Sequence, residues 1–162
     1  MDAIGLLKTR RSIRYFEEKE ISLDILNKVF ELTRYAPSAK NSQPSYLVIV
    51  KDKEKRDKLG AIRGKSSAPI ARAPLAVAIC ADPSISTRYI QDGCIFAYHF
   101  MLSAWAYGLG TCWIADMDRD EVKEILGIPK DHYVATVTPL GYPGEAPPIK
   151  DRKRIEEFIK EI

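Results

Sequence analysis

The chain has 162 residues, 46% of them hydrophobic, and a formal net charge of +3 from 25 basic and 22 acidic side chains. This length fits one domain over residues 1–162, with a core of its own or one shared with another copy. The charge is too small and too evenly spread to indicate a nucleic-acid surface. We therefore expect no nucleic-acid partner, and any phosphate site should be local.

The cysteines and histidines argue against disulfide and metal frameworks. Cys80, Cys94 and Cys112 lack a Cys-x-x-Cys spacing and each lies in an apolar run, which predicts small buried side chains in a reducing compartment. His99 and His132 have no matching cluster of partners, so we expect no metal. No charged and then apolar leader stands at the N-terminus, which predicts a cytoplasmic protein.

The N-terminal region carries the densest anion-binding chemistry of the chain. Residues 10–14 read Arg-Arg-Ser-Ile-Arg and follow a short predicted helix from Asp2 to Lys8. Guanidinium groups offer paired donors that match a phosphate edge, and a serine hydroxyl adds another donor. The alternative is a solvated basic turn, which is what most basic clusters are.

A second helix is predicted from Ser22, an N-cap residue, to Ala36. Pro37 ends it and opens a loop, up to Ser45, that is rich in hydroxyl and amide side chains. One interpretation is a connecting turn. The other is a binding loop for a flat heteroaromatic ring, whose edge needs both donors and acceptors.

The middle of the chain alternates predicted strands and helices. Residues 46–50 form a β-branched and aromatic run, which predicts a strand, and the polar residues 51–58 predict a helix. Residues 60–72 show no clear period and are predicted to be a mobile connection. Residues 74–81 are apolar throughout, as expected for a strand in the middle of the sheet.

The longest apolar element, residues 91–107, predicts a helix that is buried all round. A core helix that also packs against a second copy of the chain is favoured over a membrane span, because Asp92, His99 and Ser103 interrupt it. His99 is expected to be a hydrogen-bonded packing residue rather than a catalytic base.

The C-terminal third begins with a glycine turn at residues 108–110 and a short predicted strand to Ala115. The turn follows a helix and lacks a third glycine, so it is no Rossmann fingerprint. A helix over 119–126 is expected to be capped by Asp118 and ended by Gly127.

A last strand is predicted over residues 133–140, followed by a turn-rich segment at 141–148. The basic pair Lys150 and Arg152 comes next. The chain closes with a predicted amphipathic helix over residues 155–162.

Four motifs, in this order, resemble the nitroreductase family of FMN-dependent oxidoreductases. They are Arg10-Arg11-Ser12-Ile13-Arg14, Ala36-Pro37-Ser38-Ala39-Lys40-Asn41-Ser42-Gln43-Pro44, Gly108-Leu109-Gly110-Thr111-Cys112-Trp113-Ile114, and Leu140-Gly141-Tyr142-Pro143 with Lys150 and Arg152. The resemblance implies an α+β fold, a central mostly antiparallel sheet flanked by helices. It also implies an intertwined homodimer with FMN at the subunit interface.

Matching the motifs position by position implies a set of cofactor-binding residues. These are Arg10, Arg11, Ser12, Arg14, Pro37, Ser38, Ala39, Asn41, Gln43, Trp113, Ile114, Ala115, Lys150 and Arg152. No catalytic side chain is required, because the flavin itself carries the chemistry.

The same resemblance implies a role for each group. Arg14 and Ser12 would face the FMN phosphate, and Arg10 the pyrimidine end and the ribityl chain. Lys150 and Arg152 would close over the phosphate. The loop that begins at residue 37 would come from the partner subunit, and backbone groups at residues 114 and 115 would approach the reactive ring nitrogen.

Two departures from the family pattern stand out. Longer members place an asparagine near the pyrimidine edge from the segment that corresponds to residues 60–72, and this chain has none there. That contact is lost, replaced by Arg63, Lys65, Ser66 or Ser67, or moved elsewhere. Some members also carry an acidic residue at the position of Ala115, where this chain leaves only the backbone.

The resemblance implies an enzyme that uses NADH or NADPH to reduce small electron-poor acceptors such as nitroaromatics, quinones or free flavins, in alternating half-reactions. Within flavin chemistry, a specialised reaction such as reductive dehalogenation or flavin destruction is the alternative. A non-catalytic flavin-binding or storage protein is a second, and a nucleic-acid binder a third. We expect no membrane partner.

Overall fold

The computed structural model describes residues 2–162. Its sheet has the order β1–β2–β3, with β1 (Ser45–Val50), β2 (Leu75–Ala81) and β3 (Tyr133–Leu140) paired antiparallel. The α+β class and the antiparallel sheet are confirmed, and the all-apolar strand is central as predicted. The register shifts at Ile79/Cys80, where β3 holds one extra residue.

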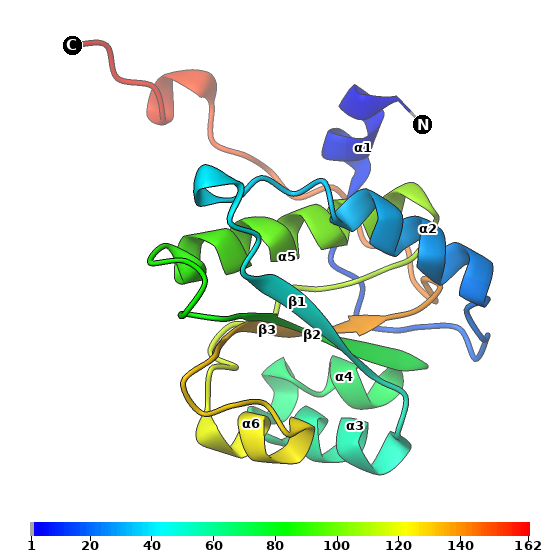
Figure 1. Cartoon of the computed structure of the whole chain (residues 1–162). Coiled ribbons are helices and arrows are strands. Elements are labelled where there is room, and N and C mark those ends of the chain that lie inside the picture. The colour runs from blue at the N-terminus through cyan, green and yellow to red at the C-terminus, as the bar shows by residue number, and fades with distance from the viewer. Residues whose placement is uncertain (1) are drawn as a thin grey trace.

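Helices cover both faces of the sheet (Figure 1), with α2 and α5 on one side and α3, α4 and α6 on the other. The helices are α1 (Ala3–Thr9), α2 (Leu23–Thr33), α3 (Lys53–Ala61), α4 (Pro69–Arg72), α5 (Tyr89–Ala106) and α6 (Asp120–Leu126). Short 3₁₀ turns are η1 (Ala39–Asn41), η2 (Gly64–Ser66) and η3 (Ile155–Glu157).

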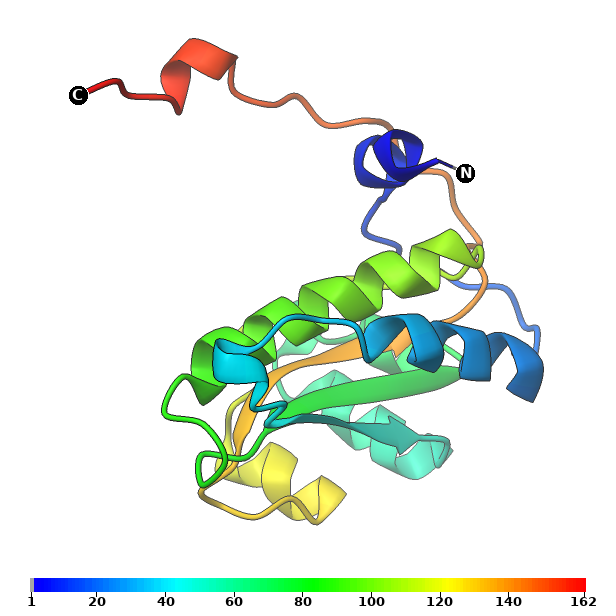
Figure 2. The ribbon, with the colours of Figure 1, turned by 45° about the horizontal axis from the view of Figure 1, so that its top comes forward.

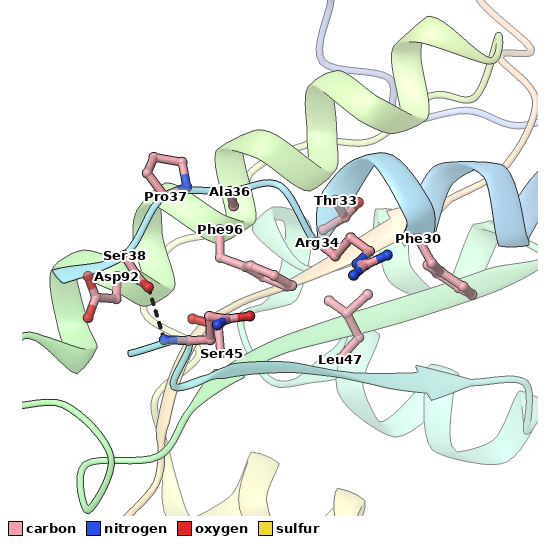
Figure 3. Close-up of a pocket in the computed structure, with 11 residues that line it drawn as sticks. Phe30, Thr33, Arg34, Ala36, Pro37, Ser38, Ser45, Leu47, Asp92 and Phe96 are labelled. Atoms are coloured by element: carbon pink, nitrogen blue, oxygen red, sulfur yellow. Dashed lines mark hydrogen bonds between the residues drawn. The ribbon is translucent and has the colours of Figure 1, made fainter. Parts of the chain in front are cut away.

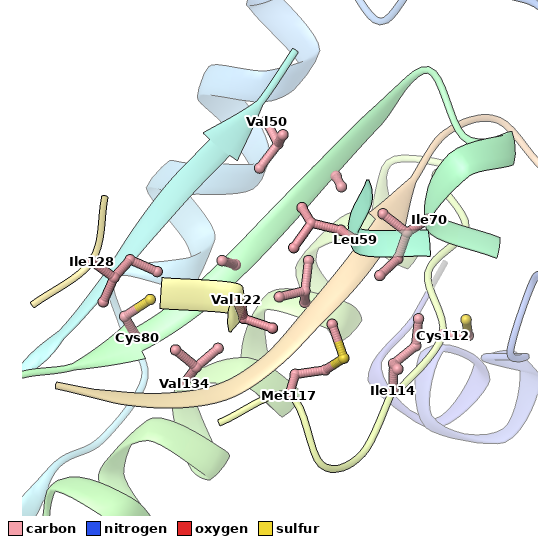
Figure 4. Packing of buried hydrophobic residues seen from close by; sticks show 13 residues of the cluster. Val50, Leu59, Ile70, Cys80, Cys112, Ile114, Met117, Val122, Ile128 and Val134 are labelled. Carbon is pink, nitrogen blue, oxygen red and sulfur yellow. The ribbon is translucent and has the colours of Figure 1, made fainter. Parts of the chain in front are cut away.

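The alternation of side chains along β2 divides the core into two clusters. Ala76, Ala78 and Cys80 face α3, α4 and α6, whereas Val77 and Ile79 face α2 and α5. Figure 4 shows the first cluster, in which helix side chains meet those of the strands. A strand with both faces buried explains why its sequence is apolar throughout.

Helix α2 begins as predicted, because the Ser22 hydroxyl accepts the N–H of Ile25 at 3.3 Å. It ends at Thr33 rather than at Ala36. The N–H of Ala36 donates to the carbonyl of Thr33 at 3.1 Å, so the chain tightens into a turn before the proline.

The prediction of an irregular, mobile connection over residues 60–72 was wrong. Ile70 is fully buried, and the Ser67 hydroxyl donates to the carbonyl of Gly60 at 2.7 Å while accepting the N–H of Arg63 at 2.9 Å. A buried serine therefore folds the segment into η2 and α4. The pattern of hydrophobic residues in the sequence gives no sign of such a side-chain hydrogen bond.

The predicted cap of α6 was also wrong. No side chain caps this helix at Arg119. Asp118 instead accepts the N–H of Val134 at 3.1 Å and pairs with Lys123 at 2.8 Å. Gly127 ends the helix as expected, with a left-handed φ of 68°.

The predicted strand over residues 111–115 does not form a ladder. Only isolated bridges occur there, between Gly110 and Gly141 and between Thr111 and Ser12. The segment runs extended beside β3, where threonine side chains take the place of backbone partners.

The predicted C-terminal amphipathic helix is absent. The chain forms only η3, and residues 148–162 are exposed. An amphipathic helix needs an apolar surface for its buried face. Figures 1 and 2 show this arm leaving the body beside α1, so its own chain offers it no such surface.

Within one chain, helix α5 leaves part of its surface open: Ile90, Ile95 and Tyr98 are 44–49% exposed. The predicted contact of this helix with a second copy of the chain stays a prediction. His99 Nε2 donates a hydrogen bond to the carbonyl of Leu32 at 3.1 Å, which confirms its packing role. Among the described residues, no helix has the length and apolar character needed to cross a membrane.

Candidate functional site

Three of the four motifs lie side by side. The N–H of Ile13 donates to the carbonyl of Thr111 at 2.9 Å, which joins the arginine motif to the glycine turn. The N–H of Gly144 donates to the carbonyl of Tyr15 at 3.0 Å, which joins the same motif to the Gly-Tyr-Pro turn. Residues more than 90 positions apart in sequence thus form one surface.

Close packing explains the glycine of the turn. A Cβ at Gly110 would stand 2.7 Å from the Cβ of Ile13, too close for any real contact. Ile13 is itself 1% exposed and cannot give way. The glycine therefore allows the arginine motif to lie directly against the turn.

An open hollow of about 440 Å³ lies where the arginine motif, the glycine-turn segment and η2 meet. It is lined by Arg14, Arg63, Lys65, Ser66, Cys112, Trp113, Ile114 and Ala115. Three of these side chains are cationic. Three of the four candidate replacements for the missing asparagine are here, while Ser67 is buried beneath them.

Two threonines of β3 orient the wall of this hollow. Thr136 Oγ1 accepts the N–H of Ile114 at 3.2 Å and donates to its carbonyl at 2.9 Å, and Thr138 Oγ1 donates to the carbonyl of Cys112 at 3.0 Å. Successive backbone groups of an extended chain point to opposite sides. The carbonyl of Ala115 accordingly points away from β3 and accepts Arg63 at 2.5 Å.

Burial follows the same alternation. Cys112 and Ile114 are each 2% exposed, whereas Trp113 is 41% exposed beside the hollow. Burial raises the pKa of the Cys112 thiol to about 11, so this cysteine stays protonated near neutral pH. Ile114 has its N–H already bonded to Thr136, which leaves Ala115 as the backbone group directed outward.

Asp116, just beyond this wall, has a left-handed φ of 60°. That conformation costs a residue with a side chain about 1–2 kcal/mol. The carboxylate pairs with Arg119 and lies 3.4 Å from Arg63. A hydrogen bond from Arg119, helped by the charges of both arginines, holds the pKa of Asp116 below its usual value.

A second hollow, of about 500 Å³, lies between α1, α5 and the C-terminal arm. It is lined by Leu7, Lys8, Arg10, Arg11, Tyr98, Ile149, Lys150 and Arg152. No acidic side chain lines it, and its cations make no ion pair with any described residue. This is the stronger anion site of the two.

The two hollows divide the arginine motif differently from the sequence-based assignment. Arg10 lines the second hollow with the basic pair Lys150 and Arg152, whereas Arg14 lines the first hollow with the glycine-turn segment. The assignment of Arg14 to the phosphate and Arg10 to the ring end stays a prediction, and the lining of the two hollows favours the opposite assignment. Ser12 lines neither hollow.

The remaining motif, which forms the loop at residues 37–45, lies apart from the other three. It sits at the N-terminal end of α5, while the glycine turn follows the C-terminal end (Figure 1). With 18 residues at 1.5 Å each, this helix is about 27 Å long. One chain does not bring its four motifs together.

The loop borders a smaller pocket of about 240 Å³, drawn in Figure 3. The pocket is lined by Phe30, Thr33, Arg34, Ala36, Pro37, Ser38, Gln43, Ser45, Leu47, Asp92 and Phe96. Pro37, Ser38 and Gln43 are predicted site residues. Ala39 and Asn41, in η1, do not line it.

The loop backbone is unusual for a segment without glycine. Lys40, Asn41 and Gln43 all have left-handed φ values, between 52° and 54°. The Ser38 hydroxyl accepts the N–H of Gln43 at 2.9 Å and closes the loop. Such conformations persist only where surrounding contacts determine them.

Sequence reasoning missed three residues that shape these surfaces. Thr136 orients the wall of the first hollow, Asp116 pairs with Arg63 behind it, and Asp92 accepts a loop N–H. The available signals were a carboxylate early in an apolar helix and the Thr-x-Thr spacing of β3. The described residues contain no group of three or more His, Cys, Asp or Glu side chains that could hold a metal.

Comparisons with known proteins agree with this geometry. The model of the nitroreductase family matches residues 7–78 and 63–142. A relative from Archaeoglobus fulgidus is 33% identical over 151 residues, covering 88% of this chain and 86% of its own. Its name combines NADH dehydrogenase with NAD(P)H nitroreductase.

Solved structures agree as well. An FMN-dependent nitroreductase from Clostridium difficile superposes with a TM-score of 0.87 at 30% identity, with 98% of each chain covered. An NADPH:FMN oxidoreductase from Vibrio harveyi, solved with NAD⁺, has a TM-score of 0.87 at 26% identity over 98% of this chain and 76% of its own. With a family model that matches most of its length, this chain belongs to the nitroreductase family.

Proposed function

We propose that the protein is a cytoplasmic, single-domain FMN-dependent oxidoreductase that takes electrons from NADH or NADPH and passes them to small electron-poor acceptors. Nitroaromatics, quinones and free flavins are the acceptor classes. The observation that carries the proposal is the pair of adjoining cationic hollows, built from three of the family motifs.

The donor chemistry of the hollows fits FMN. A phosphate carries close to two negative charges near neutral pH. Arg10, Lys150 and Arg152 supply cations for it in a hollow without acidic lining, and Lys8 and Arg11 add to that charge. The first hollow offers the half-exposed Trp113 and an outward-facing backbone at Ala115, which suit a ring and its polar edge.

When bound, FMN supplies the ring that accepts and returns a hydride. The chain's own groups orient and stabilise that ring. Arg14 and Arg63 would hold positive charge beside a ring bound in this hollow, and that charge would stabilise the negative charge that reduction leaves on it. Asp116 limits this effect, because its carboxylate partly neutralises Arg63.

A homodimer completes the site in this proposal. The loop lies at the N-terminal end of α5, whereas the cationic hollows are lined by Tyr98 in the middle of this helix and by residues 112–115, which follow it in sequence. A two-fold axis across this helix would bring the loop of one chain against the hollows of the other. The exposed side chains of Ile90, Ile95 and Tyr98 supply an apolar face for that contact. Pro37, Ser38, Ala39, Asn41 and Gln43 would then reach the site of the partner subunit.

The test is a visible absorption spectrum of the purified protein, followed by anaerobic addition of NADH and then NADPH. Flavin bands that bleach with either donor are expected, and an added quinone should restore them. Bands that persist with both donors would leave a flavin-binding protein without this activity. A protein that remains colourless after FMN addition would contradict the proposal.

A further inference from the structure

We infer that Asp92 is a positioning residue for the cofactor: it holds the strained loop of residues 38–43 in the shape that reaches the flavin site. The inference rests on the proposed function for the role of this loop. Asp92 itself touches neither cationic hollow.

Both carboxylate oxygens of Asp92 are used. Oδ1 accepts the backbone N–H of Ala39 at 2.9 Å, at the start of η1. Oδ2 accepts the hydroxyl of Ser86 at 2.7 Å, and Ser86 in turn accepts the N–H of Arg88 at 3.1 Å. This chain of bonds ties the loop to the beginning of α5.

Burying the Asp92 carboxylate costs free energy. Asp92 is 3% exposed, and no described residue forms an ion pair with it. Buried carboxylates are usually paired with a cation. Here neutral donors and the first turn of an 18-residue helix, whose exposed N–H groups favour negative charge, stabilise it.

The loop is the element that needs such an anchor. Lys40, Asn41 and Gln43 are left-handed, and each would relax toward ordinary φ values if the loop were released. Ala39 directly precedes them, so its bond to Asp92 fixes the point where the strained backbone begins. The hydroxyls of Ser42, within the loop, and of Ser45, just after it, are buried without a partner in the described residues, so they do not hold it.

The experiment measures the FMN dissociation constant of Asp92→Ala, Asp92→Asn and Ser86→Ala dimers by fluorescence quenching. Asp92→Ala removes a hydrogen bond to a charged acceptor and should raise the constant by about tenfold or more. Asp92→Asn keeps one acceptor oxygen and should recover most of that loss. Ser86→Ala should lie between the wild type and Asp92→Ala.

Asp118 provides the matched control, because its carboxylate also accepts a backbone N–H, that of Val134, on the other side of the sheet. Asp118→Ala should lower the melting temperature while leaving the FMN constant within twofold of the wild type. If the Asp92 variants behave like Asp118→Ala, Asp92 has only a structural role and the inference is overturned. Should Asp92→Ala fail to fold, Ser86→Ala decides in the same way.

A second readout needs no flavin. Amide hydrogen exchange of peptides covering residues 38–44 in the flavin-free protein should be at least tenfold faster in Asp92→Ala than in the wild type. Asp118→Ala should instead speed exchange around Val134. Unchanged exchange at residues 38–44 would overturn the inference even if FMN binds, whereas a wild-type protein that binds no FMN would overturn the proposed function alone.

Discussion

The loop at the N-terminal end of α5 and the second cationic hollow are built on different principles. At the loop, a buried carboxylate and a network of hydrogen bonds hold a strained backbone whose one charged side chain is Lys40. In the second hollow, arginines and lysines form no ion pair with any described residue. The loop is preorganised, whereas the hollow has positive charge available for an anion.

The difference shows which residues are free to bind. Arg10, Lys150 and Arg152 form no ion pair with any described residue, so their charges are available to a ligand phosphate. The loop differs from the hollow, because its left-handed backbone is unfavourable and is stabilised by hydrogen bonds within the chain. We therefore expect FMN binding to respond to charge substitutions in the hollows and to loss of hydrogen bonds at the loop.

Removal of Arg14 should have the largest effect. Hydrogen bonds to charged groups are worth about 1.5–3 kcal/mol, so Arg14→Gln should raise the FMN dissociation constant about 10- to 100-fold. The melting temperature should change little, because this side chain is exposed. Lys58→Gln removes an exposed cation that pairs only with Glu54 and should leave FMN binding unchanged.

Mixed dimers test whether the loop of one subunit meets the cationic hollows of the other. Co-expressed chains with Arg14→Gln and Asp92→Ala should form dimers in which both changes fall in one site and the other site is intact. Titration should then find one FMN bound per dimer with wild-type affinity. If each chain completes its own site, both sites would be damaged and no tight binding would be recovered.

The close approach of the arginine motif to the glycine turn can be broken without removing a charge. In Gly110→Ala, the new Cβ would stand 2.7 Å from Ile13, and overpacking should cost about 1–3 kcal/mol in urea unfolding. FMN affinity should fall as well, because the motif is displaced. Gly93→Ala is the control: its Cβ would meet neighbours at 3.4 Å within a helix, so stability should hold or rise.

The smallest expected effect concerns the threonines behind the first hollow. Thr136→Val keeps the shape but leaves the N–H of Ile114 without its partner, which should cost about 1–3 kcal/mol in unfolding free energy. Thr138→Val loses a donor that the carbonyls of Cys112 and Pro139 share, leaves no N–H without its partner and should cost less. Equal losses in the two variants would contradict the special role given to Thr136.

Much of the fold was readable from local patterns. The apolar run of β2 predicted its central position, Ser22 predicted the start of α2, and Gly127 predicted the end of α6. These features depend on propensity, capping and burial, which act over a few residues. The motifs that identified the family are short and contiguous for the same reason.

The errors arose where a distant partner decided the outcome. Ser67 fixes the fold of residues 60–72 through its hydrogen bond to Gly60. Asp118 bonds the N–H of Val134 instead of capping α6. The C-terminal arm is exposed, so its apolar side chains do not pack against its own chain. In the same way, only the fold shows that Arg10 and Arg14, which are close in sequence, line different hollows.

The sequence by itself determined the secondary structure of the sheet, the two-sided burial of β2 and the presence of four binding motifs, because each depends on side chains close together in the chain. Only the tertiary structure decided that three motifs converge while the loop at residues 37–45 lies at the other end of α5, a helix about 27 Å long, from the glycine turn. Distances of this kind depend on how helices pack on the sheet, and no local pattern encodes them.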